Sequence, residues 1–404
     1  MINKISFKNY KLFKEKQTLE LKPITILIGK NNSGKSAVLK LPTLIAGSLS
    51  GEFKEPFRLM NEGVKIADEY RDVVYGRGKM VLGLELFQKK SLSNDDDFIK
   101  TDIYIDDNEP IIESWNCNNN INLFRLDNDN YQNIKLNKEQ ETHFNGINIK
   151  ESELIGESQT KIQLPVFKIN TDFIGAIRQK SNINYPYSQN IPEKSAIDGN
   201  NLYQFLIDDY LSTDKKYFNQ VSNWIKEKFE GWEIKIDVDG YKKEIPAIIE
   251  LEKGNLRINI SQTGMGISQV LPLIIRAFKP CKEETLIIIE EPESHLHPYA
   301  HSQIAQLFFE SLKADSNKRY LIETHSQNFI LRLRRLVAEG KLKSDDLNIY
   351  YVNFNEEKGE SVLERICVDK NGGVDKWPEG VFGETVLEAR AIMNANTNDL
   401  RNVD

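Results

Sequence analysis

The sequence predicts an α/β fold whose core is a mostly parallel sheet, and two observations carry this prediction. In the last third of the chain, short apolar runs alternate with helical patterns, giving a strand at 285–289, a helix at 300–312, a strand at 320–323 and a helix at 327–338. Such alternation is typical of parallel sheets, and the first of these runs is apolar throughout, as expected for a strand buried on both faces. Near the N-terminus, a β-branched run at 24–28 leads into a glycine-rich loop and a further apolar stretch.

Shorter patterns predict the remaining elements. Strands are expected at 2–7 and 17–21, and Pro42 is expected to bend or stop the first helix just before it. Short β-rich pieces bounded by Asn and Asp dominate the region after residue 90, which predicts an antiparallel meander. Apolar residues at helical spacing fill 202–229, and strands follow.

We expect four parts along the chain. These are an N-terminal lobe with the glycine-rich loop (1–90), a polar β-rich insertion (91–170), a helical and β subdomain (171–260) and a C-terminal lobe (261–404). A length of 404 residues allows two or three domains, and 40% hydrophobic with 28% charged residues suits a globular protein with a substantial core.

Charge, hydropathy and cysteine content exclude several protein classes. No stretch approaches the ~18 apolar residues of a membrane helix, and the first residues resemble a strand and not a signal peptide. The three cysteines, Cys117, Cys281 and Cys367, have no metal-ligand spacing. We therefore expect a cytoplasmic protein without a membrane partner. The net charge of −7 leaves only a local basic patch for binding nucleic acid.

The loop after the first apolar run fits the phosphate-binding pattern G-x-x-x-x-G-K-[ST]. Its backbone N–H groups would line a concavity for phosphate oxygens, and the next helix would point its positive end there. Lys35 would reach the β- and γ-phosphates, and the Ser36 hydroxyl would hold Mg²⁺. The alternative is a glycine-rich turn without a ligand. The predicted phosphate-binding residues are Gly29, Asn31, Asn32, Ser33, Gly34, Lys35 and Ser36.

A second motif, the acidic end of the 285–289 strand, supplies two adjacent carboxylates. Phosphoryl transfer depends on positioning and charge stabilisation, so one carboxylate can orient the metal shell while the other polarises water. Alternation along a strand points the two side chains in different directions. We expect Glu290 on the metal side and Glu291 as the base. Exposed acids without a role are the alternative.

Two further motifs accompany these carboxylates. His325 follows the 320–323 strand, where ligands of open α/β sheets collect, and could sense a γ-phosphate. The glycines of 262–269 precede a helix and form a second anion-binding corner, which suggests a site that another subunit completes. A metal cluster of histidines is a weaker interpretation, because the spacing lacks a zinc signature; it would comprise His295, His297 and His301.

The four motifs, in this order, resemble those of the ABC-like ATPases of the SMC, RecF and OLD group, in their bacterial AAA-15/AAA-21 form. Residues 290–298 are similar to the E-E/Q-P-E-x-H-L-H-P segment of that group, and 324–326 match its T-H-S switch. Residues 264–272 resemble its signature element, and 371–382 resemble a small C-terminal extension of some members. Gly175 and Arg178 lie in a G-x-x-R stretch to which we assign no role.

This resemblance implies an ABC-type head that hydrolyses ATP with Mg²⁺. The head would have a mostly parallel core sheet, an antiparallel β subdomain and a helical subdomain. Glu291 would be the catalytic carboxylate and His325 the switch. Gly264, Gly266 and Ser268 would contact the γ-phosphate of ATP held by a partner protomer, so a homodimer or higher homo-oligomer is expected. We expect no TOPRIM nuclease domain, since the chain ends soon after the head.

Three features depart from the family pattern. Glu290 stands where an Asp is usual, so its metal contact would run through water. Gly264 stands at the usual signature serine, for which Ser268 would substitute. No Q-loop glutamine is evident, and 72–76 is the region where one is expected.

We predict a nucleotide-controlled switch that dimerises around ATP and controls a separate effector, a nuclease or toxin, in bacterial antiviral defence. The alternative is a RecF-like DNA-repair ATPase that binds DNA directly, through Arg332, Arg334 and Arg335. A third possibility is a nucleotide-binding scaffold without turnover. A small-molecule kinase fits less well, because the acidic strand end and the switch histidine favour water as acceptor.

Overall fold

The computed structural model describes residues 1–77, 80–90, 96–127, 129–149, 164–186, 192–238, 246–378, 381–382 and 388–392. Its centre is a six-stranded sheet in the order β14-β18-β19-β3-β20-β21. All neighbours pair in parallel except β20 and β21, which are antiparallel. The predicted mostly parallel core is therefore confirmed. The strands are β14 (Thr171–Ile174), β18 (Thr285–Glu290), β19 (Lys318–Glu323), β3 (Ile24–Gly29), β20 (Leu347–Asn355) and β21 (Glu360–Ile366).

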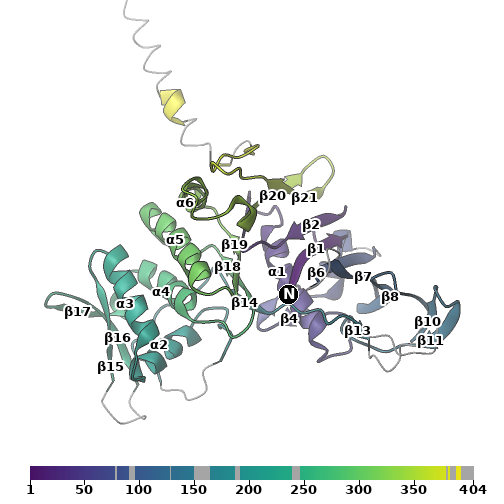
Figure 1. Ribbon diagram of the computed structural model, residues 1–404, viewed down its shortest axis with the longest axis horizontal. Coiled ribbons are helices and arrows are strands. Elements are labelled where there is room, and N and C mark those ends of the chain that lie inside the picture. The colour runs from purple at the N-terminus through teal and green to yellow at the C-terminus, as the bar shows by residue number, and fades with distance from the viewer. Residues whose placement is uncertain are drawn as a thin grey trace, which may run out of the picture.

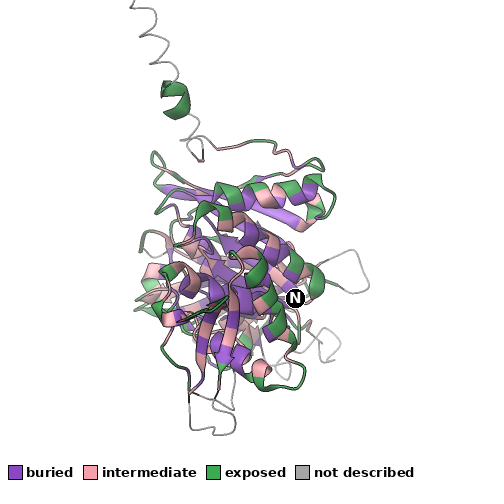
Figure 2. Ribbon diagram, turned by 90° about the vertical axis from the view of Figure 1, so that its left-hand side faces the viewer, coloured by how far each residue is buried: buried purple, intermediate pink, exposed green. Residues whose placement is uncertain are grey.

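Two separate hydrophobic cores cover the two faces of this sheet. Alternate side chains of each buried strand point to opposite faces, so Ile287 and Ile289 of β18 join one core while Leu286 and Ile288 join the other. Helix α1 (Lys35–Ser50) packs in the second core, and the other long helices pack in the first. These helices are α2 (Asn201–Leu211), α3 (Lys216–Lys228), α4 (Met265–Phe278), α5 (Pro298–Ala314) and α6 (Gln327–Ala338). Figure 2 shows the buried strands between exposed helix faces.

An eight-stranded antiparallel sheet, in the order β11-β10-β9-β8-β7-β6-β1-β2, completes the second core. The antiparallel β subdomain is therefore confirmed, and it extends to one end of the molecule (Figure 1). The division at residue 90 stays a prediction, because this sheet joins strands from both sides of it. Residues 91–95, 128 and 150–163 of the predicted insertion lie outside the described residues. The strands are β1 (Ile2–Lys8), β2 (Gln17–Glu20), β6 (Leu82–Lys89), β7 (Asp96–Asp106), β8 (Glu109–Cys117), β9 (Ile121–Asp127), β10 (Asn130–Asn133) and β11 (Lys138–Glu141).

The opposite end of the molecule holds a smaller subdomain (Figure 1). A three-stranded antiparallel sheet packs there against α2 and α3, in the part of the chain where a helical and β subdomain is predicted. Its strands are β15 (Glu233–Asp237), β16 (Ile248–Lys253) and β17 (Leu256–Asn259). Two short antiparallel strand pairs lie in the loops. They are β4 (Met60–Asn61) with β5 (Val64–Lys65), and β12 (Phe144–Asn145) with β13 (Asn148–Ile149).

Of the bend or stop expected at Pro42, helix α1 excludes the stop. It does not stop before Pro42 but continues to Ser50 with the proline inside. Proline removes one hydrogen bond from a helix, but Leu41, Leu44 and Ile45 are fully buried on both sides of it. The apolar contacts of these side chains hold the second half of the helix in place.

Candidate nucleotide site

The carboxyl ends of three adjacent parallel strands build the site. β3 lies beside β19, and β19 lies beside β18, so the loops that follow the three strands meet at one edge of the sheet. Glu290 and Glu323 are register partners on β18 and β19. The topology therefore brings together residues that are about 290 positions apart in the chain, as open α/β sheets do at ligand sites.

The loop between β3 and α1 approaches its neighbours closely. A Cβ added at Gly29 would lie 2.4 Å from the Val352 carbonyl oxygen of β20, and Gly34 has a left-handed φ of 100°. The Ser361 hydroxyl donates to the Ser33 carbonyl at 2.7 Å. Gly34 is the N-cap of α1 and provides no side-chain cap. The first N–H groups of this helix therefore remain available to an anion.

Both polar side chains at the start of α1 contact one carboxylate, that of Glu323. The Ser36 hydroxyl donates to Oε2 of Glu323 at 3.0 Å, and Nζ of Lys35 lies 3.7 Å from its Oε1. Nζ of Lys35 also donates to the Lys30 carbonyl at 2.8 Å. Burial raises the pKa of Glu323 to about 7, although Lys35 opposes this shift, and burial lowers the pKa of Lys35.

Glu290 points in a different direction from the predicted metal contact. Its Oε2 accepts a hydrogen bond from the Ala176 backbone N–H at 3.3 Å, at the end of β14. The carboxylate against Ser36 is therefore that of Glu323, one strand nearer to the loop. Sequence reasoning missed Glu323, and the available signal was a carboxylate directly after the buried run Tyr320, Leu321 and Ile322.

Glu291 and His325, which follow β18 and β19, face each other. Nε2 of His325 lies 3.8 Å from Oε1 of Glu291, and both side chains are more than one-third exposed. Ser294 Oγ donates to the other carboxylate oxygen at 2.8 Å, which orients the group. Burial lowers the pKa of His325. The arrangement can position and polarise a water molecule between two exposed polar groups.

The buried carboxylate of Glu293 holds the predicted switch segment, residues 324–326, in place. It accepts hydrogen bonds from the Thr324 hydroxyl at 2.8 Å and from the His325 backbone N–H. Burial raises its pKa. Ser326 then caps α6 by accepting from the Phe329 N–H at 3.1 Å. Sequence reasoning also missed Glu293, which is the third acid of the E-E-P-E run.

The predicted signature corner divides into exposed and buried residues. Gly264 is exposed and a Cβ there would contact nothing within 4 Å, and Gly266 is half-buried. Ser268 is buried, and its hydroxyl accepts from the Ser181 backbone N–H at 3.3 Å. The prediction that Ser268 replaces the signature serine toward a partner is therefore wrong in this arrangement, because its hydroxyl faces the interior.

Arg178 connects this corner to the carboxylates. Its guanidinium donates to the Glu291 carbonyl at 2.8 Å and to Oε1 of Gln269 on α4 at 3.4 Å. Gln269 returns a hydrogen bond to the Arg178 carbonyl at 2.9 Å. Burial lowers the pKa of Arg178 to about 10. The G-x-x-R stretch therefore joins α4 to the end of β18.

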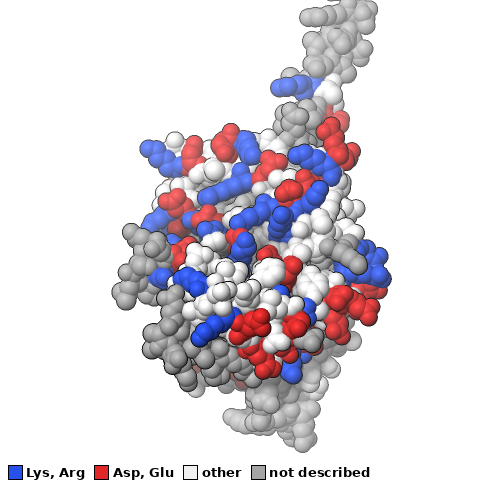
Figure 3. All heavy atoms as spheres, turned by 90° about the vertical axis from the view of Figure 1, so that its right-hand side faces the viewer, with Lys and Arg blue, Asp and Glu red and all other residues white. Residues whose placement is uncertain are grey.

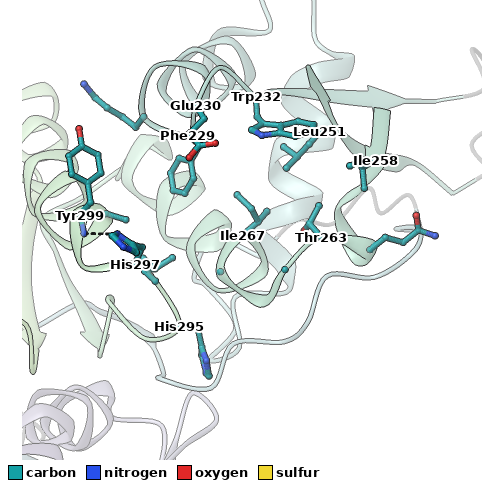
Figure 4. A pocket seen from close by; sticks show the side chains of 16 residues that line it. Phe229, Glu230, Trp232, Leu251, Ile258, Thr263, Ile267, His295, His297 and Tyr299 are labelled. Atoms are coloured by element: carbon teal, nitrogen blue, oxygen red, sulfur yellow. Dashed lines mark hydrogen bonds between the residues drawn. The ribbon is translucent and has the colours of Figure 1, made fainter. Parts of the chain in front are cut away.

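A pocket of about 690 Å³ borders the signature corner, and Gly264 and Gly266 are among the residues that line it (Figure 4). Phe229, Trp232 and Ile267 present apolar surface to it, and His295, His297 and Tyr299 lie at its other side. His297 caps α5 by accepting from the Tyr299 N–H, and His301 bonds Ser326 and the Leu296 carbonyl. Among the described residues, no group of three His, Cys, Asp or Glu side chains could hold a metal ion.

The three arginines of the DNA alternative are all engaged within the chain. Arg332 bonds Gln306, Arg334 donates to the Gly372 carbonyl at 2.8 Å, and Arg335 pairs with Glu339. On the face seen in Figure 3, basic side chains are interspersed with acidic ones. Each of these arginines therefore has a partner within the chain, and direct DNA binding stays the alternative. Glu379 and Gly380 of the predicted C-terminal extension lie outside the described residues. No described helix has the length and hydropathy of a membrane span.

Comparisons with known proteins agree with this architecture. A solved SMC head bound to the C-terminal winged-helix domain of ScpA has a TM-score of 0.52 at 15% identity, covering 91% of this chain and 99% of that one. SMC heads from Thermotoga maritima (TM-score 0.44, 12% identity, 90% and 98% covered) and Pyrococcus furiosus (0.47, 13%, 91% and 97%) are also similar. No curated protein matches.

The fold and the site together define an ABC-type ATPase of the SMC and RecF kind. Residues 1–330 match the family model described as AAA ATPase domain, and the chain belongs to that family. Residues 342–391 match a second family, described as a protein of unknown function, DUF3696. The predicted resemblance is therefore confirmed.

Proposed function

We propose that this protein hydrolyses ATP with Mg²⁺ and uses the nucleotide to join two copies of itself. The observation that carries the proposal is the Glu291–His325 pair, which stands at the edge of the sheet beside Lys35 and Ser36. Phosphoryl transfer to water needs an oriented nucleophile and positive charge near the phosphates. Glu291 and Lys35 supply these two requirements.

The residues present fit Mg²⁺. Ser36, Glu323 and Glu290 offer hydroxyl and carboxylate oxygens at one edge of the sheet, and Mg²⁺ is usually held by one or two carboxylates with phosphate oxygens and water. When bound, the ion would neutralise charge on the phosphates. Lys35 would bind the β- and γ-phosphates, Glu291 would accept the proton of the attacking water, and His325 would donate a hydrogen bond to the γ-phosphate.

Dimerisation is part of the proposal because the signature corner belongs to α4, which packs in the first core, whereas the helix after the phosphate loop packs in the second core, on the other face of the sheet. Gly264 and the uncapped N-terminus of α4 are open for an anion. A second copy placed head to tail would bring this corner onto the bound nucleotide. The SMC head that resembles this chain is bound to a ScpA domain, which supports a separate effector protein, and a nuclease or toxin of antiviral defence is the candidate.

Glu291→Gln tests this function. The variant keeps a hydrogen-bonding group of the same size but cannot accept the proton, so phosphate release should fall by about 100-fold or more while ATP binding persists. Light scattering should then show a dimer in ATP and a monomer without it. Lys35→Ala is the matched control and should remain monomeric in ATP. A Glu291→Gln variant that binds ATP but stays monomeric would contradict the dimer, and phosphate release equal in wild type and Lys35→Ala would contradict hydrolysis.

A further inference from the structure

One carboxylate contacts both side chains that the phosphate loop would offer to a nucleotide. Glu323 is buried at the end of β19, where it accepts from the Ser36 hydroxyl at 3.0 Å and lies 3.7 Å from Lys35 Nζ. The contact is specific, because Glu290 turns toward Ala176 and Glu291 toward Ser294. The Glu323 carboxylate therefore affects how Lys35 and Ser36 would bind a nucleotide.

The Ser36 contact sets the direction of the hydroxyl group. A hydroxyl has one proton and two lone pairs, and the proton of Ser36 points to Glu323. Its lone pairs then remain free to face a cation. Groups that accept a hydrogen bond from a metal ligand in this manner fix the orientation of that ligand and tune its affinity.

The contact between Glu323 and Lys35 would oppose the binding of a nucleotide without a metal ion. Lys35 is buried, and its ammonium group donates a hydrogen bond to the Lys30 carbonyl and forms an ion pair with Glu323. Triphosphate oxygens that approach Lys35 would meet a carboxylate charge on the same ammonium group, and like charges at short distance repel strongly where water is excluded. A divalent cation between the phosphates and the carboxylate would reverse this repulsion.

From this geometry we propose that Glu323 makes nucleotide binding dependent on Mg²⁺, by orienting Ser36 toward the cation and by opposing a metal-free triphosphate at Lys35. Glu323 acts as a positioning residue and not as the base. The inference rests on the proposed ATP-binding function and adds the residue that selects the metal-loaded form of the substrate.

The test measures binding of a fluorescent ATP analogue at pH 8, in Mg²⁺ and in EDTA, to the full chain. For the wild type, Mg²⁺ should strengthen binding by about 30-fold or more. Glu323→Gln retains an oxygen that accepts from Ser36 but removes the charge, so EDTA binding should strengthen by about 5–10-fold and the Mg²⁺-to-EDTA ratio should fall below about threefold. Equal melting temperatures of the nucleotide-free proteins would show that folding is unchanged.

A control variant makes the assignment specific. Glu310→Gln removes an exposed carboxylate on α5 that bonds Gln306. It should keep a ratio above tenfold. A wild-type ratio in Glu323→Gln, or an equal fall in Glu310→Gln, would overturn the inference and leave ATP binding intact. A wild-type protein that binds the analogue under neither condition would overturn the proposed function itself.

Discussion

Gly29 ends β3 and begins the phosphate loop, close against the neighbouring strand β20. A methyl group there would lie 2.4 Å from the Val352 carbonyl oxygen, which is backbone and cannot move without shifting β20. The tight spacing explains why the pattern requires glycine at this position. The conformation of the loop therefore also depends on the position of β20.

Gly29→Ala should therefore lower the free energy of unfolding by about 1–3 kcal/mol, the usual cost of overpacking, and weaken ATP binding. Urea unfolding and ligand titration would measure the two effects. Gly264→Ala is the control, because a Cβ there meets nothing within 4 Å, and its stability should change by only a few tenths of a kcal/mol. An unchanged unfolding midpoint in Gly29→Ala would show that β20 shifts to accommodate the methyl group at little cost in free energy.

Some residues of the site were predictable from the sequence and others were not. Lys35, Ser36 and the Glu291–His325 pair follow from motif spacing, because each stands at the end of an apolar run. Glu323 and Glu293 were missed because their importance lies in burial and in partners on other strands. Ser268 was predicted in the wrong environment, since helical phase turns its hydroxyl inward toward Ser181.

At the scale of elements, Arg178 joins α4 to the end of β18. It holds the Glu291 carbonyl on one side and Gln269 on the other. Glu291 has a left-handed backbone with φ of 44°, which is uncommon for a residue other than glycine and needs support from its surroundings. If a second copy contacts α4 as proposed, a movement of α4 would reach Glu291, the proposed catalytic carboxylate, through Arg178.

Arg178→Lys should lower kcat by about tenfold or more with little change in KM, because lysine keeps the charge but cannot bridge both acceptors in the planar geometry of a guanidinium. Steady-state phosphate release gives the two constants. Gln269→Ala should have a similar effect, and the double variant should be no worse than either alone. Additive losses in the double variant would show that the two residues act separately.

Most elements were predicted, but their partners were not. The helices at 298–314 and 327–338 match their apolar periodicity closely. Helix α1 continues past Pro42, where a bend or a stop was expected, because tertiary burial outweighs one proline. The pairing of β1 with β6 and the closing of an eight-stranded sheet depend on contacts between distant segments. Local patterns carry no information about such contacts.

At the scale of the whole molecule, the central sheet serves both hydrophobic cores. Ile287 faces the core of the five long helices, and Ile288 faces the core of the eight-stranded sheet. Because a strand cannot leave one core without leaving the other, the two should lose their structure together.

Ile287→Ala and Ile288→Ala should each lower the free energy of unfolding by about 2–5 kcal/mol and keep a single transition. Circular dichroism and tryptophan fluorescence would follow both cores, since Trp224 belongs to the first and Trp115 to the second. Coincident curves would agree with a shared sheet. A variant in which one signal is lost well before the other would show that each core is stable alone.

The position of β3 in the sheet has a consequence for biosynthesis. This strand is made early, but its two neighbours, β19 and β20, span 318–323 and 347–355. Translation adds about 5–20 residues per second, so on the order of 15–60 s pass before either edge of β3 can pair. During that interval the nascent N-terminal half presents an apolar strand with two open edges, a known hazard for aggregation.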